Sequence, residues 1–269
     1  KDKVDKFIVT ESTYSHSGKK KKLNFDINNY SKFKDKIIYI VIDKEPEGIV
    51  VENNDPSLQR SNSLKRIALS YDESLKAIKD FSDEDLVMLS DNDEIPNLNS
   101  NQFNKSKKNI ILFKQLFFYF KFNLLYDRMF WVGTKACKKK KLKSLSWLRN
   151  IKLKKYPFWR LDTLFSETKQ TNLDIIEDGG WHFTNLKTAE EMYEKFMNFG
   201  HHDEFRLSGL TVEKIREKIR NKEMFYDHFA DQSSTNKWKS NYKLKKYDLN
   251  LLPKHIIDNQ NNYKEWIDN

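Results

Sequence analysis

A chain of 269 residues can bury a substantial core, either as one large α/β domain or as a domain with a helical extension. Its 14% aromatic content excludes a disordered chain, and its single cysteine, Cys137, excludes an intrachain disulfide and is expected in a strand or the core. The net charge of +10 suits an anionic partner, but the lysine runs lack interleaved arginine and aromatic residues, so no nucleic-acid partner is expected.

Two β-branched runs open the chain. Phe7 to Thr10 and Ile37 to Ile42 lie between polar segments and predict buried parallel strands. The loop between them holds Lys19 to Lys22, which either attract an anionic ligand or are simply solvated. Because the sequence runs from Lys1 straight into a strand pattern, we expect further residues upstream, such as an anchor or a first strand.

A helix and a third strand follow. Residues 55–79 place apolar side chains at helical spacing, which predicts a helix or a helix pair. Leu86 to Leu89 is a short apolar run, typical of a central strand. The order strand, strand, helix, strand is that of a doubly wound nucleotide-binding half, so the sequence predicts an α/β protein.

Three carboxylates, Asp91, Asp93 and Glu94, come directly after this third strand. Open α/β sheets bind ligands beyond the carboxyl ends of their strands. Two aspartates at i and i+2 can reach one hard divalent cation, for which a nucleotide diphosphate is a common partner. The pattern therefore indicates a metal and diphosphate site, although such a triplet on its own is more often a solvated turn.

The downstream half alternates aromatic and basic segments. Residues 110–125 and 129–137 predict antiparallel strands, and residues 138–155 predict a basic amphipathic helix, either packed with a solvated lysine face or lying at a membrane surface. A turn is expected at residues 179–182, within the stretch 178–183 that contains the only glycine pair.

Two more helices are expected near the C-terminus. Thr188 to Phe199 reads as a helix with Thr188 as N-cap, Glu191 three residues on, and Gly200 as its stop. Residues 211–222 predict another amphipathic helix, and the tail from Ser240 predicts a peripheral wrap.

Six short blocks, taken in order, resemble glycosyltransferase family 17, the family of the β-1,4-mannosyl-glycoprotein 4-β-N-acetylglucosaminyltransferases. They cover most of residues 4–210, and the family's first strand and following acidic helix are missing from them. The blocks are residues 4–12 with 16–18, 59–62, 90–96, 131–135, 180–183 and 202–205.

The resemblance implies a GT-A-like nucleotide-sugar-binding domain with a mixed central sheet flanked by helices, over residues 1–210, and a helical extension packed on it over residues 211–269. It also implies inverting transfer of a sugar, typically N-acetylglucosamine, from a UDP-sugar donor to a hydroxyl of a glycan on a glycoprotein or glycolipid. The expected cofactor is Mn²⁺ or Mg²⁺.

The metal and donor residues follow from the matched blocks. Asp91 and Asp93 would hold the cation against the diphosphate, and Glu94 would orient them, touch the donor sugar or serve the fold. Glu11 and Arg60 are expected at the donor, although Arg60 could equally form a surface ion pair. Lys135 could draw in the anionic donor or be solvated.

The glycine pair and its neighbours supply the second half of the expected site. Gly180 would let the backbone approach the donor, and Trp181 would offer an apolar face to a sugar ring. His182 is expected as a third metal ligand, and a buried histidine bonded to backbone is the alternative. His201 and His202 are lesser alternatives for the same role.

An inverting transfer needs a carboxylate base for the acceptor hydroxyl. Glu190 and Asp178 are the candidates, with Glu190 slightly preferred, although its place at a helix N-terminus is equally explained by the helix dipole.

Two other classes of function stay open. One is a basic, non-catalytic module that binds nucleic acid or an anionic surface, and the other is another metal-dependent nucleotide enzyme. No glycine-rich phosphate loop with Lys-Ser/Thr is present, which argues against a P-loop enzyme. A peripheral membrane contact also stays open, and the sequence does not fix where in the cell the protein acts.

Overall fold

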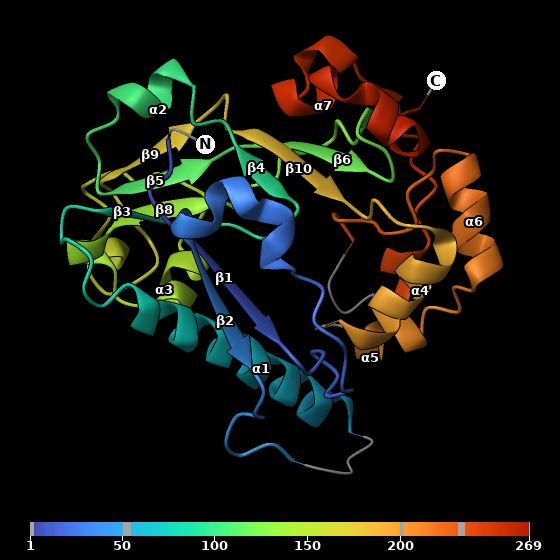
Figure 1. Ribbon diagram of the computed structural model, residues 1–269, viewed down its shortest axis with the longest axis horizontal. Coiled ribbons are helices and arrows are strands. Elements are labelled where there is room, and N and C mark those ends of the chain that lie inside the picture. Colours follow the sequence, from blue (N-terminus) through green and yellow to red (C-terminus); the bar gives the residue numbers. More distant parts are fainter. Residues whose placement is uncertain (1–2, 51–54, 200–201, 231–234, 269) are drawn as a thin grey trace. The chain divides into compact units, whose positions relative to one another are not determined.

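The computed structural model describes residues 3–50, 55–199, 202–230 and 235–268 (Figure 1). The chain forms two compact units, the first made of residues 1–82, 144–146 and 193–209, and the second of residues 83–143, 147–192 and 210–269. The expected division at residue 210 stays a prediction. In the described part of the chain, no helix has the length and apolar character needed to cross a membrane.

The first unit contains a two-stranded parallel sheet. Strands β1 (Phe7–Ser12) and β2 (Ile37–Ile42) pair in register from Phe7 opposite Ile37 to Ser12 opposite Ile42, so the parallel prediction is confirmed. The expectation that both strands are buried is wrong, because Phe7 and Val41 are 37% and 42% exposed. A sheet of two strands is too narrow to enclose both of its faces.

The helices of the first unit are α1 (Pro56–Ala77) and α5 (His202–Arg206). Residues 55–79 thus form one helix and not a pair. Asp55 caps it, since its Oδ1 accepts a hydrogen bond of 2.8 Å from the backbone of Ser57, and Pro56 occupies the first turn, where its missing N–H costs nothing.

The second unit contains a mixed four-stranded sheet in the order β3-β8-β5-β9. Its strands are β3 (Leu86–Leu89), β5 (Ile110–Phe113), β8 (Lys135–Lys138) and β9 (Leu173–Ile176). Strand β8 is antiparallel to both β3 and β5, whereas β9 is parallel to β5. Leu86 to Leu89 is therefore a strand, as predicted, but it lies at an edge and not in the centre. The predicted doubly wound order is also wrong, because β1 and β2 belong to a separate sheet.

A mixed five-stranded sheet in the order β11-β7-β6-β10-β4 completes the second unit. Strand β10 is parallel to β6 and antiparallel to β4, and this pairing positions the candidate site. The strands are β4 (Glu94–Pro96), β6 (Leu116–Tyr119), β7 (Leu124–Leu125), β10 (Gly180–Thr184) and β11 (Lys245–Lys246). The α/β prediction is confirmed, with several mixed sheets in place of one central sheet. The GT-A-like assignment stays a prediction.

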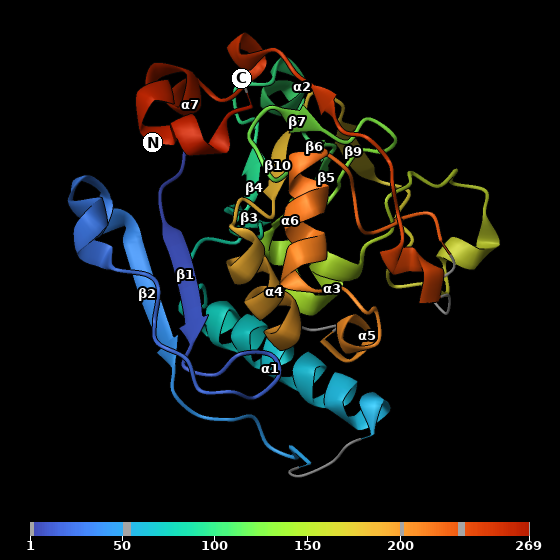
Figure 2. The same ribbon diagram turned by 90° about the vertical axis from the view of Figure 1, so that its right-hand side faces the viewer.

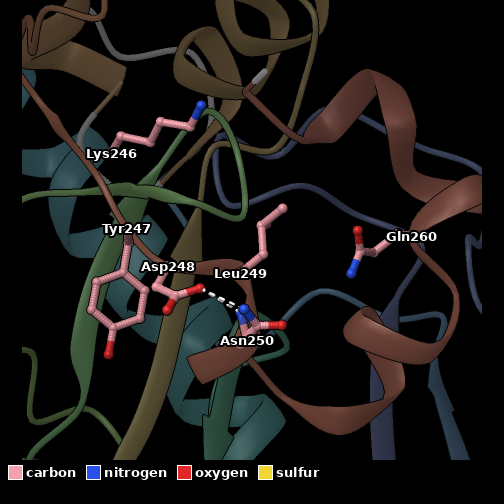
Figure 3. A pocket seen from close by; sticks show the side chains of 6 residues that line it. All are labelled: Lys246, Tyr247, Asp248, Leu249, Asn250 and Gln260. Atoms are coloured by element: carbon pink, nitrogen blue, oxygen red, sulfur yellow. Dashed lines mark hydrogen bonds between the residues drawn. The ribbon is translucent and has the colours of Figure 1, made fainter.

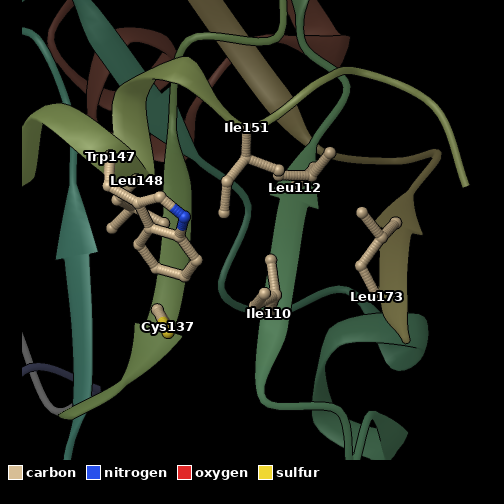
Figure 4. Close-up of a cluster of buried hydrophobic side chains, with 7 residues drawn as sticks. All are labelled: Ile110, Leu112, Cys137, Trp147, Leu148, Ile151 and Leu173. Atoms are coloured by element: carbon tan, nitrogen blue, oxygen red, sulfur yellow. The ribbon is translucent and has the colours of Figure 1, made fainter. Parts of the chain in front are cut away.

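A buried cluster packs the four-stranded sheet against α3 (Leu145–Asn150) (Figure 4). It contains Cys137, which is fully buried in β8 as expected. The predicted helix over residues 138–155 is wrong, because it is reduced to a 3-10 turn, Lys139–Lys141, and the six residues of α3. The cluster consists of Ile110, Leu112, Cys137, Trp147, Leu148, Ile151 and Leu173.

The helix predicted from Thr188 is confirmed as α4 (Ala189–Asn198). Its capping box is formed, since Thr188 N donates to Glu191 Oε2 at 2.9 Å and Glu191 N donates to Thr188 Oγ1 at 3.3 Å. Its expected stop, Gly200, lies outside the described residues. The remaining helices are α2 (Asn101–Lys105), α6 (Val212–Arg220) and α7 (Lys254–Asp258).

The C-terminal tail contributes to the core of the second unit. Leu252, just before α7, and Ile256, on α7, are buried in one cluster with Phe118 of β6 and Phe183 of β10. Figure 1 shows α7, in red, beside β6 and β10. The tail is therefore more than a peripheral wrap.

Candidate active site

Glu94 fixes the loop that carries the three carboxylates. Its side chain is buried, and its Oε2 accepts hydrogen bonds from the backbone of Asp91 at 3.0 Å and from Thr134 Oγ1 at 3.1 Å. Its Oε1 accepts a bond of 2.7 Å from Trp131 Nε1. Gly133 leaves the space for this carboxylate, because a Cβ there would lie 1.5 Å from Glu94 Oε1. Through these contacts Glu94 serves the fold and fixes the orientation of the carboxylate loop.

Asp91 pairs with a cation that no sequence motif singled out, Arg149 of α3. Arg149 Nη2 lies 2.7 Å from Asp91 Oδ2, and its Nη1 lies 3.7 Å from Glu94 Oε1. The guanidinium therefore stands beside the carboxylate motif and offers the planar donor fork that suits phosphate oxygens.

Lys135 holds the end of α3. Its Nζ donates to the carbonyl oxygen of Arg149 and, at 2.8 Å, to that of Ile151. Burial, and next the nearby charge of Arg149, lower the pKa of Lys135 to about 8. Lys135 is only 4% exposed, so the expectation of a solvated lysine is wrong, whereas an attraction of the anionic donor by its charge stays a prediction. Lys135 instead positions Arg149.

His182 lies next to Asp93 because β10 pairs with β4, which places His182 opposite Glu94. His182 Nε2 is 3.4 Å from Asp93 Oδ1, and Phe183 N donates to the backbone oxygen of Asp93 at 2.8 Å. The imidazole is 5% exposed, and its Nδ1 has no hydrogen-bond partner among the described residues. The alternative predicted for His182, a buried histidine bonded to backbone, is thus not seen among the described residues.

Aromatic rings surround this imidazole. The ring of His182 stacks on Phe117 and Trp131, with centroid distances of 4.8 and 4.6 Å. Tyr119, two residues after Phe117 on β6, has its hydroxyl 3.0 Å from His228 Nε2. Burial lowers the pKa of His228 to about 4, so this second imidazole is neutral at pH 7. Sequence reasoning missed His228, and its only signal is the short aromatic stretch in which it lies.

Asp93 and His182 could share a cation. Asp93 Oδ1 and His182 Nε2 are 3.4 Å apart, near the spacing of about 3 Å between neighbouring ligands of an octahedral Mg²⁺. The other predicted ligand, Asp91, faces Arg149. Among the residues that the structure describes, no three His, Cys, Asp or Glu side chains form a metal-binding group. A cation there would take its remaining ligands from water and the donor.

The family of this chain is shown by a family model that matches nearly the whole length of the chain. The model of Glycosyltransferase family 17 matches residues 1–267. The chain belongs to glycosyltransferase family 17. It is therefore a glycosyltransferase, an enzyme with a sugar donor and a glycan acceptor, and the resemblance seen in the six sequence blocks is confirmed. Neither the curated proteins nor the solved structures contain a match to this enzyme.

Trp181 of the glycosyltransferase lies on the opposite face of β10 from His182, because side chains alternate along a strand. It packs against the buried cluster of Phe118 and Leu252, and its Nε1 donates to the oxygen of Leu251 at 3.2 Å. The structure therefore does not bring Trp181 to the Asp93 and His182 pair.

Gly180 is required by strand packing. Its φ is +112°, and a Cβ there would lie 2.2 Å from the oxygen of Ile95 on β4. Because Gly180 begins β10, the turn predicted at residues 179–182 is wrong. The expected contact of Gly180 with the donor stays a prediction.

Neither candidate base touches the Asp93 and His182 pair in the described contacts. Asp178 is exposed and accepts a bond of 2.8 Å from Asn97 Nδ2. It lies in the bend that precedes β10. Glu190 is exposed in the first turn of α4 and pairs with Arg216 of α6.

The two donor residues predicted in the first unit are engaged within that unit. Glu11 accepts bonds from Lys21 Nζ at 2.7 Å and Tyr39 OH at 3.1 Å. Burial alone would raise the pKa of Glu11, but the bonds from Lys21 and from two backbone N–H groups outweigh it and lower the pKa. Arg60 Nη2 lies 2.6 Å from Glu204 Oε1, so two of the matched blocks contact each other.

The structure describes one of the two lesser histidine candidates, His202. His202 is buried in α5, where its Nδ1 lies 2.9 Å from the oxygen of Phe199, as expected of a histidine bonded to backbone. His201 lies outside the described residues.

An open hollow of about 500 Å³ lies in the C-terminal part of the second unit (Figure 3). None of the predicted site residues lines it. The lining residues are Lys246, Tyr247, Asp248, Leu249, Asn250 and Gln260.

Proposed function

We propose that this family 17 glycosyltransferase is an inverting, metal-dependent enzyme that transfers N-acetylglucosamine from a UDP-sugar to a glycan hydroxyl, on a GT-A-like fold. The observation that carries the proposal is the pair of contacts on one loop, Asp93 with His182 and Asp91 with Arg149. The first pair suits a cation, and the guanidinium of the second suits a diphosphate. The donor sugar is taken from the family.

The chain's own residues would act on the donor in three ways. Glu94 holds the loop in place, so that Asp91 and Asp93 need little reordering when the donor binds. Arg149 can turn from Asp91 to the diphosphate, where its charge stabilises the leaving group. Neutral His228 adds no positive charge against a cation beside Asp93.

The expected cofactor is Mn²⁺ or Mg²⁺, held by Asp93 and His182, with Asp91 acting directly, through water or through Arg149. A bound cation would neutralise the charge that develops on the leaving diphosphate. Imidazole favours Mn²⁺ over Mg²⁺ as the cation.

The proposal is tested by thermal unfolding of the enzyme with UDP- and GDP-sugars in the presence of Mn²⁺. We expect UDP-N-acetylglucosamine with Mn²⁺ to raise Tm by about 5 °C or more at 100 times Kd, and EDTA to abolish the shift. If no nucleotide sugar stabilises the protein with metal, the proposal fails. Binding of DNA or RNA with a steep salt dependence would then favour the non-catalytic module.

Glu190 is the proposed base, with Asp178 as the alternative. Glu190→Gln is expected to lower kcat for transfer by about 10²-fold or more while Mn²⁺-dependent donor binding is kept. Asp178→Asn serves as the matched comparison. A bond from its own backbone N–H, and next the hydrogen bond from Arg216, lower the pKa of Glu190. Because the base acts ionised, protonation of Glu190 should lower the activity only in acid. Retention of full activity in both variants would exclude both carboxylates.

A further inference from the structure

The segment between α3 and β9 displays apolar side chains to solvent. Residues 152–172 leave the core at Ile151 and return to it at Leu173, both buried in the cluster of Figure 4. Lys152 N donates to the oxygen of Thr168 at 2.9 Å, and Tyr156 N to that of Gln170 at 3.2 Å, so the two arms are tied together at the base. In Figure 2 this yellow segment extends away from β9 at the right.

The tip of this segment is strongly hydrophobic and strongly exposed. Six large apolar residues fall within thirteen positions, whereas solvated loops are normally polar. Their exposed fractions are far above those of core side chains: Leu153 54%, Phe158 85%, Trp159 69%, Leu161 72%, Leu164 76% and Phe165 89%.

The charges around this tip are positive. Lys152, Lys154 and Lys155 are exposed on the arm that leads to it. Its acids are neutralised locally, since Asp162 Oδ2 lies 2.7 Å from both Arg160 and Lys169. Glu167 likewise pairs with Lys143, 3.0 Å away. The loop has an apolar tip and a positively charged base. It is therefore complementary to a surface that has an anionic outer layer and an apolar interior.

We propose that residues 152–169 form a membrane-binding loop that inserts its apolar tip into the headgroup region of an anionic bilayer. The aromatic and leucine side chains would be buried among the acyl chains, and the three lysines would lie against lipid phosphates. A glycan is a poorer occupant, because Leu153, Leu161 and Leu164 offer nothing to sugar hydroxyls. The loop would hold the glycosyltransferase at a bilayer surface independently of its donor chemistry.

The test is flotation of the whole protein with vesicles of phosphatidylcholine alone or with 30% phosphatidylglycerol, where about 30% is a convenient anionic content. We expect binding to the anionic vesicles to exceed binding to the neutral ones by about 10-fold, and to weaken at high salt. Phe158→Ser combined with Phe165→Ser should lower it by about 10-fold or more, as should Lys154→Glu combined with Lys155→Glu. Leu251→Ser, at a 56% exposed leucine outside the loop, is the matched control and should bind as the wild type does.

Depth of insertion gives a second measurement that does not depend on a disruptive change. Brominated acyl chains should quench tryptophan fluorescence of the wild type, and Trp159→Phe should keep binding while losing most of the quenching. Absence of wild-type binding to anionic vesicles overturns the proposal, as does binding that the loop variants leave unchanged. Failure of the donor assay above would leave these results unaffected, so the two proposals fail separately.

Discussion

Asp93→Ala is expected to lower kcat/KM for sugar transfer by about 10²–10³-fold and to remove the Mn²⁺-dependent stabilisation by the donor. The reason is that Asp93 and His182, 3.4 Å apart, are the pair proposed to hold the cation. The fold should survive, because the ladder contact at this position runs from Phe183 N to the backbone oxygen of Asp93, which alanine keeps. Transfer rates with and without Mn²⁺, together with Tm, check both parts.

Asp83→Ala is the matched control for this change. Asp83 is an exposed acid of the same unit, and its partner Lys139 lies 3.7 Å away. Such a surface pair contributes little, so the control should keep wild-type activity and metal response. Activity of Asp93→Ala within a few-fold of the wild type would remove Asp93 from the proposed site.

Local sequence patterns predicted where a strand lies in the chain better than they predicted which strands lie next to it in the sheet. Leu86 to Leu89 was predicted as a strand because four apolar residues lie between turn signals, and β3 has those bounds. Its place at a sheet edge depends on pairing with Lys135–Lys138, some fifty residues away in the chain. Such pairing leaves no local pattern, which is why a central parallel strand was predicted.

The glycine pair shows how a correct observation can predict the wrong element. Glycine at 180 does have positive φ, but the cause is the approach of Ile95 on β4, and the chain is already a strand there. The same alternation that faces His182 toward Asp93 faces Trp181 away from it. A strand prediction would have separated these two side chains, whereas a turn allowed both in one site.

The positively charged side chains near the site were the hardest part to predict. Lys135 ends a conspicuous motif block and precedes a lysine run, so it was expected at the surface or at a ligand, yet it is buried and donates to carbonyl oxygens at the end of α3. Arg149 lies in the basic segment whose face was expected to be solvated. Only the short length of α3, and its packing through Leu148 and Ile151, brings Arg149 to Asp91. The acids were predictable from spacing, but their partners required the tertiary structure.

Glu94→Ala is expected to lower the free energy of unfolding by about 3 kcal/mol, or Tm by roughly 5 °C. The buried carboxylate accepts from Trp131 Nε1, Thr134 Oγ1 and the backbone of Asp91, and its loss removes this shared acceptor from all three donors. Arg149 would also lose a carboxylate 3.7 Å from its Nη1. Since the same bonds hold the loop of Asp91, transfer activity should fall with stability.

Urea unfolding of Glu94→Ala beside Glu84→Ala separates this anchor from an ordinary surface acid. Glu84 has a 59% exposed side chain that pairs with Lys138 and Lys140, so its removal should leave the stability close to that of the wild type. Glu94→Gln should fall between the two, because its amide keeps one acceptor oxygen but turns an N–H₂ group toward an N–H donor. Equal unfolding midpoints for Glu94→Ala and Glu84→Ala would mean that the loop of Asp91 and Asp93 is held by backbone contacts alone.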